Sequence, residues 1–139
     1  MAIGRGRFPQ TYENTAVREA LVTIVSEPSR DHFDALMKCV GSGGLVVDVT
    51  GSLPNETRLR TLESTNGELI LPLFTSLKAL HTAVGMASVG SKARISAVIV
   101  DAREALGFIH TAEFVAVQFD SGTDHSLVVA RTHIEAILA

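Results

Sequence analysis

Two hydroxyl residues and a histidine lie where an apolar run gives way to an amphipathic stretch. Thr75 and Ser76 directly follow the apolar residues 69–74, and His81 comes about one helical turn further on. Hydroxyl oxygens at a helix start accept hydrogen bonds from its unpaired N–H groups, and that end of a helix also favours anions. We therefore treat Thr75, Ser76 and His81 as candidate ligand-binding residues. The simpler interpretation makes the two hydroxyl residues helix caps and His81 a core residue with a backbone hydrogen bond.

A second group of reactive side chains lies in the segment 120–126, which contains Asp120, Ser121 and His125. A nucleophilic site would need the histidine to reach the serine and the acid to reach the histidine. Neighbouring residues of a hairpin seldom offer three such orientations, and Asp, Ser and Gly are also common turn residues. We interpret this segment as a turn and predict no catalytic residue.

The metal-ligating residue types are dispersed along the chain. None of the five histidines has another at the spacing of a zinc site, and Cys39 is the only cysteine. The glycine-rich residues 41–44 follow a predicted helix and precede a predicted strand, the reverse of the order in a phosphate-binding loop. We therefore predict no metal site and no cofactor, and we interpret Cys39 as a partly buried, inert thiol.

The N-terminal part of the chain predicts a helical hairpin. Residues 1–13 are expected to form a flexible lead-in, and residues 14–139 a single domain. Asn14 or Thr15 can cap a first helix that stops near Pro28. Ser29 can cap a second helix, which Gly41 would close.

The central part predicts strands and one hairpin. The β-branched run 45–50 and the more polar run 58–64 are expected to be strands, as is the apolar run 69–74. Asn66 and Gly67 suit a type I′ turn that pairs the last two of these strands antiparallel. Pro72 cannot donate to a sheet ladder, so we expect pairing to end near it.

The C-terminal half alternates between helices and strands. Its predicted helices are residues 77–86, a short one after the capping box 101–104 ending near Gly107, and a final one capped by Thr132. Its predicted strands are residues 93–100, 114–119 and 126–130. The whole order predicts an α+β fold: a single domain whose N-terminal helical hairpin and further helices pack on a mostly antiparallel or mixed sheet of about five to six strands.

The run LPLFTS at residues 71–76, followed by a leucine-rich helix, resembles the signature of the SseB N-terminal domain family, which is named for an enhanced serine-sensitivity phenotype. The resemblance covers residues 14–139 and implies an α+β domain, with no catalytic mechanism attached. Family members often carry an Asn-Pro pair at the end of a late strand. The matching place here is Phe119-Asp120.

Composition restricts the possible partners and compartments. A net charge of −3 disfavours a nucleic-acid binder, which needs a basic face. No apolar run approaches the length of a membrane span or a signal peptide, so we expect no membrane association. A single cysteine excludes an internal disulfide and favours the cytoplasm.

Two functions agree with these observations. The first is a non-enzymatic protein-interaction or regulatory module that binds a protein partner or forms a homodimer through an open strand edge or a helix face. The second is a small-molecule, amino-acid-related sensor, or an enzyme with an unrecognised site, near the helix start at Thr75 and Ser76.

Overall fold

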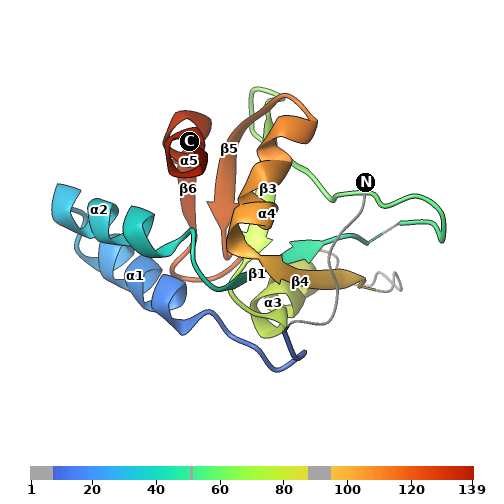
Figure 1. The fold of residues 1–139 in the computed structure, drawn as a ribbon, viewed down its shortest axis with the longest axis horizontal. Coiled ribbons are helices and arrows are strands. Elements are labelled where there is room, and N and C mark those ends of the chain that lie inside the picture. Colours follow the sequence, from blue (N-terminus) through green and yellow to red (C-terminus); the bar gives the residue numbers. More distant parts are fainter. Residues whose placement is uncertain (1–7, 51, 88–94) are drawn as a thin grey trace.

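The computed structural model describes residues 8–50, 52–87 and 95–139 (Figure 1). The helices in this part of the chain are α1 (Thr15–Ser26), α2 (Arg30–Cys39), α3 (Leu77–Ala87), α4 (Ala102–Gly107) and α5 (Arg131–Leu138), with a 3-10 turn at Phe108–Thr111. The strands are β1 (Gly44–Asp48), β2 (Leu62–Glu63), β3 (Leu69–Phe74), β4 (Ala97–Asp101), β5 (Phe114–Phe119) and β6 (Leu127–Ala130).

The strands form one mixed sheet in the order β4-β1-β3-β5-β6, with β2 beside β3. The β3–β5 pair is parallel and the other strand pairs are antiparallel. The chain is thus an α+β domain with a mixed sheet, as the pattern of elements predicted. Because β3 and β5 are parallel, their C-terminal ends lie side by side at the same end of the sheet, and so do the segments that follow them.

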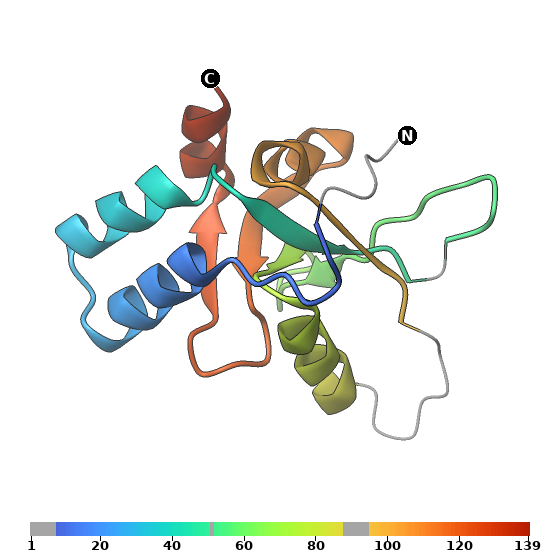
Figure 2. The same ribbon diagram turned by 60° about the horizontal axis from the view of Figure 1, so that its bottom comes forward.

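The helices cover the two faces of the sheet unequally (Figure 2). Helices α1, α2, α4 and α5 contribute to a large buried cluster on one face, together with Leu71, Leu73, Val117 and Phe119 of the central strands. Helix α3 covers part of the other face, where Leu80 packs on Val46 and Phe74. The apolar character of β3 on both faces is explained by this double cover.

The predicted caps of the N-terminal helices are confirmed. The Asn14 side chain accepts a hydrogen bond from the Val17 N–H (3.2 Å), and the Ser29 hydroxyl accepts one from the His32 N–H (3.1 Å). Asn14 also donates through Nδ2 to the backbone carbonyls of Ser42 and Gly44. One side chain therefore caps α1 and ties it to the start of β1.

The hairpin between β2 and β3 forms, but its predicted turn type is wrong. Gly67 has a positive φ of 80°, whereas Asn66 is not among the residues with positive φ, as a type I′ turn would require. The Gly67 N–H donates to the Ser64 carbonyl, and the Ser64 hydroxyl accepts from the N–H groups of Asn66 and Glu68. The serine side chain thus stabilises a wider turn in which only the glycine is left-handed.

The prediction that pairing ends near Pro72 is also wrong. Leu73 and Phe74 pair with β1, Leu69 and Ile70 pair with β2, and Pro72 between them pairs with neither strand. The proline occupies the place where β3 changes partners, so its missing N–H interrupts no ladder on that side. On the other side Pro72 keeps its place in the β3–β5 register opposite Gln118.

Several predicted boundaries need correction. Only Leu62–Glu63 of the predicted strand 58–64 forms a strand, and β4 begins at Ala97, with residues 93 and 94 outside the described part. Helix α3 continues through the predicted weak point at residue 85 to Ala87, and residue 90 also lies outside the described part. Ala130, not Thr132, precedes α5, and Asp101 precedes α4 without a side-chain capping bond.

The alternation predicted for β5 is broken near its start. Leu69 lies opposite Phe114, but the next residue of β3 lies opposite Ala116, so Val115 is an inserted residue. Phe114 consequently joins the same buried cluster as Val117 and Phe119, while Val115 is exposed. A bulge of this kind cannot be read from the alternation of residue types.

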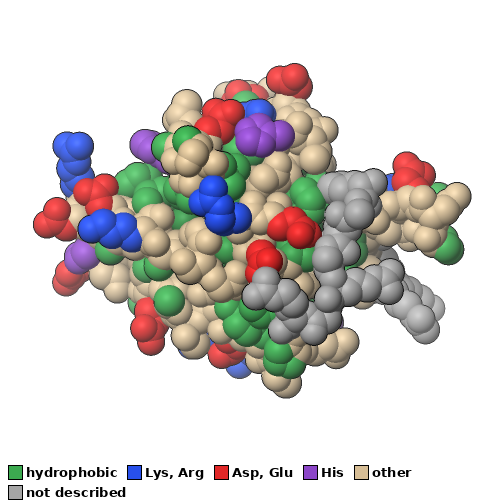
Figure 3. Space-filling view, viewed as in Figure 1, with side chains coloured by type: hydrophobic (Ala, Val, Ile, Leu, Met, Phe, Trp, Pro, Cys, Tyr) green, Lys and Arg blue, Asp and Glu red, His purple; other side chains and the backbone are tan. Residues whose placement is uncertain are grey.

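Charged side chains of both signs are interspersed over the end of the molecule formed by α1 and α2 (Figure 3). Among the described residues, no helix combines the length and the apolar character needed to cross a membrane.

Candidate functional site

The predicted helix start holds two hydroxyl residues with different roles. Ser76 is a cap, because its Oγ accepts from the Ala79 N–H at 3.1 Å. Thr75 is not a cap, because its N–H and its hydroxyl both donate to Asp120. Its carbonyl accepts from the Asn14 N–H, so Thr75 joins three parts of the chain. Both residues are buried.

His81 is exposed, and the expectation that it is a core residue is wrong. The face of α3 that packs on the sheet carries Leu77, Leu80, Ala83 and Val84. At about 100° per residue, His81 lies on the flank of that face. The structure therefore separates His81 from the pair that it was expected to join.

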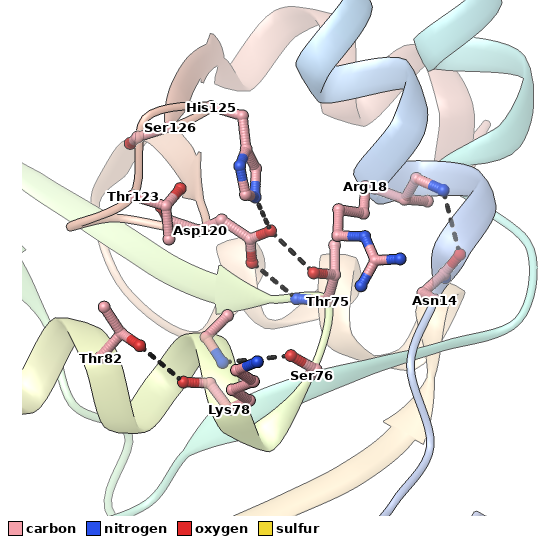
Figure 4. Close-up of polar contacts among 12 residues, drawn as sticks. Asn14, Arg18, Thr75, Ser76, Lys78, Thr82, Asp120, Thr123, His125 and Ser126 are labelled. Carbon is pink, nitrogen blue, oxygen red and sulfur yellow. Dashed lines mark hydrogen bonds and ion pairs between the residues drawn. The ribbon is translucent and has the colours of Figure 1, made fainter.

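A buried carboxylate forms the base of the site. Asp120 follows β5, is completely buried, and has a positive φ of 47°, which Asp tolerates better than most residues. One oxygen accepts from the Thr75 N–H at 2.7 Å, and the other accepts from the Thr75 hydroxyl at 2.7 Å and faces His125 Nε2 at 2.8 Å. Figure 4 shows this chain of contacts from His125 through Asp120 to Thr75.

The β5–β6 turn is held close to α3. Thr123 donates from its N–H and its hydroxyl to the Asp120 carbonyl. Gly122 has a φ of 81°, and a Cβ atom there would lie 2.9 Å from Cα of Ala83. A side chain at this position would collide with the backbone of α3, so glycine allows the turn to lie against the helix.

These segments enclose a cleft of about 220 Å³ at the start of α3. Its lining comes from the segment before α1, from α1, from the β3–α3 junction, from α3 and from the β5–β6 turn. The lining residues are Glu13, Arg18, Thr75, Ser76, Lys78, Ala79, Thr82, Thr123 and His125. Most of these residues are labelled in Figure 4.

The cleft collects basic side chains from three separate segments. Arg18 comes from α1, Lys78 from α3 and His125 from the β5–β6 turn. Arg18 forms an ion pair with Glu13 at 3.1 Å, and a guanidinium has five N–H donors, so this pair leaves donors for another group. The first turn of α3 adds N–H groups that lack partners within the helix. The arrangement suits the binding of a negatively charged group.

The same geometry is unsuited to nucleophilic catalysis. In a hydrolase triad the histidine lies between the acid and the hydroxyl group. Here the acid lies between, because Asp120 contacts both Thr75 and His125. The two serines of the turn also have other surroundings. The Ser126 hydroxyl accepts a hydrogen bond from Gln118, and Ser121 lines a different cleft beside Asp48. The segment is a turn, as predicted, but its acid and histidine do meet.

Sequence reasoning missed Arg18, Lys78 and His125 as a group. Arg18 and His125 are more than one hundred positions apart, and no short motif contains any two of the three. The parallel β3–β5 pair brings the β3–α3 junction and the β5–β6 turn together. Knowledge of that pairing would have identified the group, but residue types alone do not reveal it.

The remaining histidines and the cysteine take part in other contacts. His32 contacts the Glu27 carbonyl, His110 lies 3.6 Å from Glu135, and His133 packs edge-on against Phe33. Burial raises the pKa of the Cys39 thiol, which lowers its thiolate fraction at neutral pH. The described residues contain no cluster of three metal-ligating side chains.

A comparison with known protein families completes the identification. The model of the SseB protein N-terminal domain matches residues 17–136, nearly the whole chain. The chain belongs to the SseB N-terminal domain family. The cleft lies within the matched residues apart from Glu13. A search of curated proteins returned no match.

Proposed function

We propose that this SseB-family domain is a non-enzymatic protein-interaction or regulatory module, and that it recognises a negatively charged group in the cleft at the start of α3. The observation that carries the proposal is the meeting of Arg18, Lys78 and His125 in one cleft. A concave site with a few convergent polar groups is the usual form of a binding site.

Two further features support binding over chemistry. Asp120 holds His125 and Thr75 in fixed positions, so the polar groups of the cleft are set before a ligand arrives. The described residues of the cleft contain no hydroxyl group that a histidine contacts. We also propose a cytoplasmic location, which the single cysteine favours.

The test is an NMR titration of ¹⁵N-labelled protein with sodium succinate, sodium phosphate and, as a cationic comparison, tetramethylammonium chloride. We expect succinate or phosphate to shift the amide signals of residues 75–79 and 123–125, and the cation to leave them unchanged. The double variant R18Q/K78Q should weaken this binding by about tenfold or more, because two charge-assisted contacts are lost.

The matched control is R30Q/K38Q, which removes the same charge from exposed positions of α2 outside the cleft. It should bind as the unmodified protein does. If no anion shifts the cleft signals, or if both double variants weaken binding equally, the cleft is not an anion site and the proposal fails.

A second candidate function is a sensor for an amino-acid-related small molecule. The observation that favours it is Glu13, whose carboxylate lines the same cleft as the basic side chains. An α-amino acid could then place its carboxylate near Arg18 or Lys78 and its ammonium group near Glu13. His81 has no part in this proposal.

Native mass spectrometry and calorimetry separate the two candidates. A co-purified small molecule, or binding of L-glutamate that N-acetylation weakens, would favour the sensor. A homodimer, or a complex with a second protein, would favour the interaction module. Binding that E13Q leaves unchanged would contradict the role of Glu13 in the sensor.

A further inference from the structure

Helix α1 carries an exposed stripe that begins in the cleft. Arg18, Val22 and Val25 follow the i, i+4, i+7 spacing of one helix face, and Arg18 lines the cleft. Val22 is 48% exposed and Val25 is 37% exposed. They are two of the few large apolar side chains that the described surface exposes, and both lie on this one stripe.

The stripe is separate from the face that holds α1 in the fold. Val17, Leu21 and Ile24 are the buried residues of the helix. Val22 and Val25 belong to neither buried cluster, so the core contacts of α1 come from its other face. An apolar pair beside a basic cleft is complementary to a ligand with a negative group followed by aliphatic groups.

We propose that the partner of this domain is a protein segment that places an acidic side chain in the cleft and aliphatic side chains along Val22 and Val25. This inference rests on the proposed function and adds the chemical class of the partner. The helix rises about 6 Å from Arg18 to Val22 and about 10 Å from Arg18 to Val25. An extended segment advances about 3.3 Å per residue and alternate side chains share a face, so the aliphatic residues that face α1 should follow the acidic one by two and four positions.

The test begins with selection from a phage-displayed random dodecapeptide library on the immobilised full chain. We expect enrichment of peptides in which Asp or Glu is followed by Leu, Ile or Val at those positions. The best peptide is then synthesised with a fluorescent label, and its affinity for purified variants is measured by fluorescence anisotropy.

The decisive variant is V22T/V25T, which keeps side-chain shape and helix propensity while making both positions polar. We expect it to weaken peptide binding by about tenfold or more. The control V128T changes a valine on β6 that is 51% exposed, more than either valine of the stripe, and should bind as the unmodified protein does. Urea unfolding confirms that both variants remain folded.

Other outcomes overturn the inference in distinguishable ways. If R18Q/K78Q weakens peptide binding and V22T/V25T does not, the α1 stripe is not used, while the proposed function stands. If the selected peptides lack acidic residues, the assigned partner is wrong, and the anion titration decides the proposed function separately. If the protein is a dimer that V22T/V25T converts to a monomer, the stripe binds a second copy and not a partner segment.

Discussion

Asp48 and Asp120 are both carboxylates buried at the ends of strands, but their partners lie at different distances along the chain. Asp48 ends β1, and its oxygens lie 2.9 Å from the Thr50 N–H and 3.8 Å from the Arg60 guanidinium. Asp120 follows β5 and binds Thr75, which lies 45 positions away, twice at 2.7 Å. The first carboxylate shapes its own turn, whereas the second joins two distant segments.

The difference shows that a buried carboxylate can hold together the walls of a cleft or can stabilise only the turn next to it. The Thr50 N–H is only partly buried, so water can replace the Asp48 carboxylate as its acceptor. The Thr75 N–H and hydroxyl belong to a residue that is 1% exposed, so water cannot readily replace Asp120. Asp120 therefore positions the back wall of the cleft, and Asp48 does not.

Replacement of the two aspartates should give the largest contrast. D120A leaves the buried donors of Thr75 without an acceptor and places alanine at a positive φ, so we expect a loss of about 3 kcal/mol or more in the free energy of unfolding. D48A should lose about 1 kcal/mol, because its partners reach solvent. Urea unfolding measures both.

The variant D120N separates the effect of side-chain shape from the effect of charge at Asp120. Asparagine tolerates a positive φ and keeps one acceptor oxygen, so its cost should lie between that of D120A and zero. Equal losses for D120A and D48A would contradict the difference between the two carboxylates.

A pair of glycine variants tests whether the turn that Asp120 anchors also depends on α3. Gly67 and Gly122 have nearly the same φ, 80° and 81°, but a Cβ at Gly67 meets no atom within 4 Å, while one at Gly122 meets Ala83. G67A should cost about 1 kcal/mol for its backbone conformation alone. We expect G122A to cost at least about 1 kcal/mol more, because the turn must move away from α3.

The same variants report on the cleft. G122A should also weaken anion binding in the NMR titration, because His125 belongs to the displaced turn, whereas G67A should not. If G122A is no worse than G67A in stability, the contact with α3 is not tight and Asp120 alone holds the turn.

Local features of the structure could be predicted from the sequence because they depend on neighbouring residues. The Asn14 and Ser29 caps, the strand at residues 114–119 and the mixed α+β class all follow from side-chain type and periodicity. Features that depend on distant partners could not. Thr75 carries the same local signal as a helix cap, and only the parallel pairing of β3 with β5 gives it Asp120 as a partner. His81 was misplaced for a related reason, because the spacing of apolar residues defines a stripe but not the angle at which α3 meets the sheet.

The smallest expected effects concern the basic partners of the two carboxylates. His125 Nε2 lies 2.8 Å from Asp120 and is mostly buried, so H125Q should cost about 1 kcal/mol. Arg60 lies 3.8 Å from Asp48 with 35% of its side chain exposed, so R60Q should cost about 0.5 kcal/mol or less, because water can solvate the guanidinium and the pair is long.

Thermal and urea unfolding at low and high salt should show that H125Q loses more free energy of unfolding than R60Q does. Salt should change the cost of R60Q more than that of H125Q, because mobile ions reach the Arg60 side chain, which is 35% exposed, more readily than the His125 side chain, which is 21% exposed. A larger cost for R60Q than for H125Q would mean that Asp48 depends on its arginine more than the 3.8 Å separation implies. Asp48 would then also connect distant parts of the sheet, and the contrast between a carboxylate that shapes a turn and one that builds a site would no longer hold.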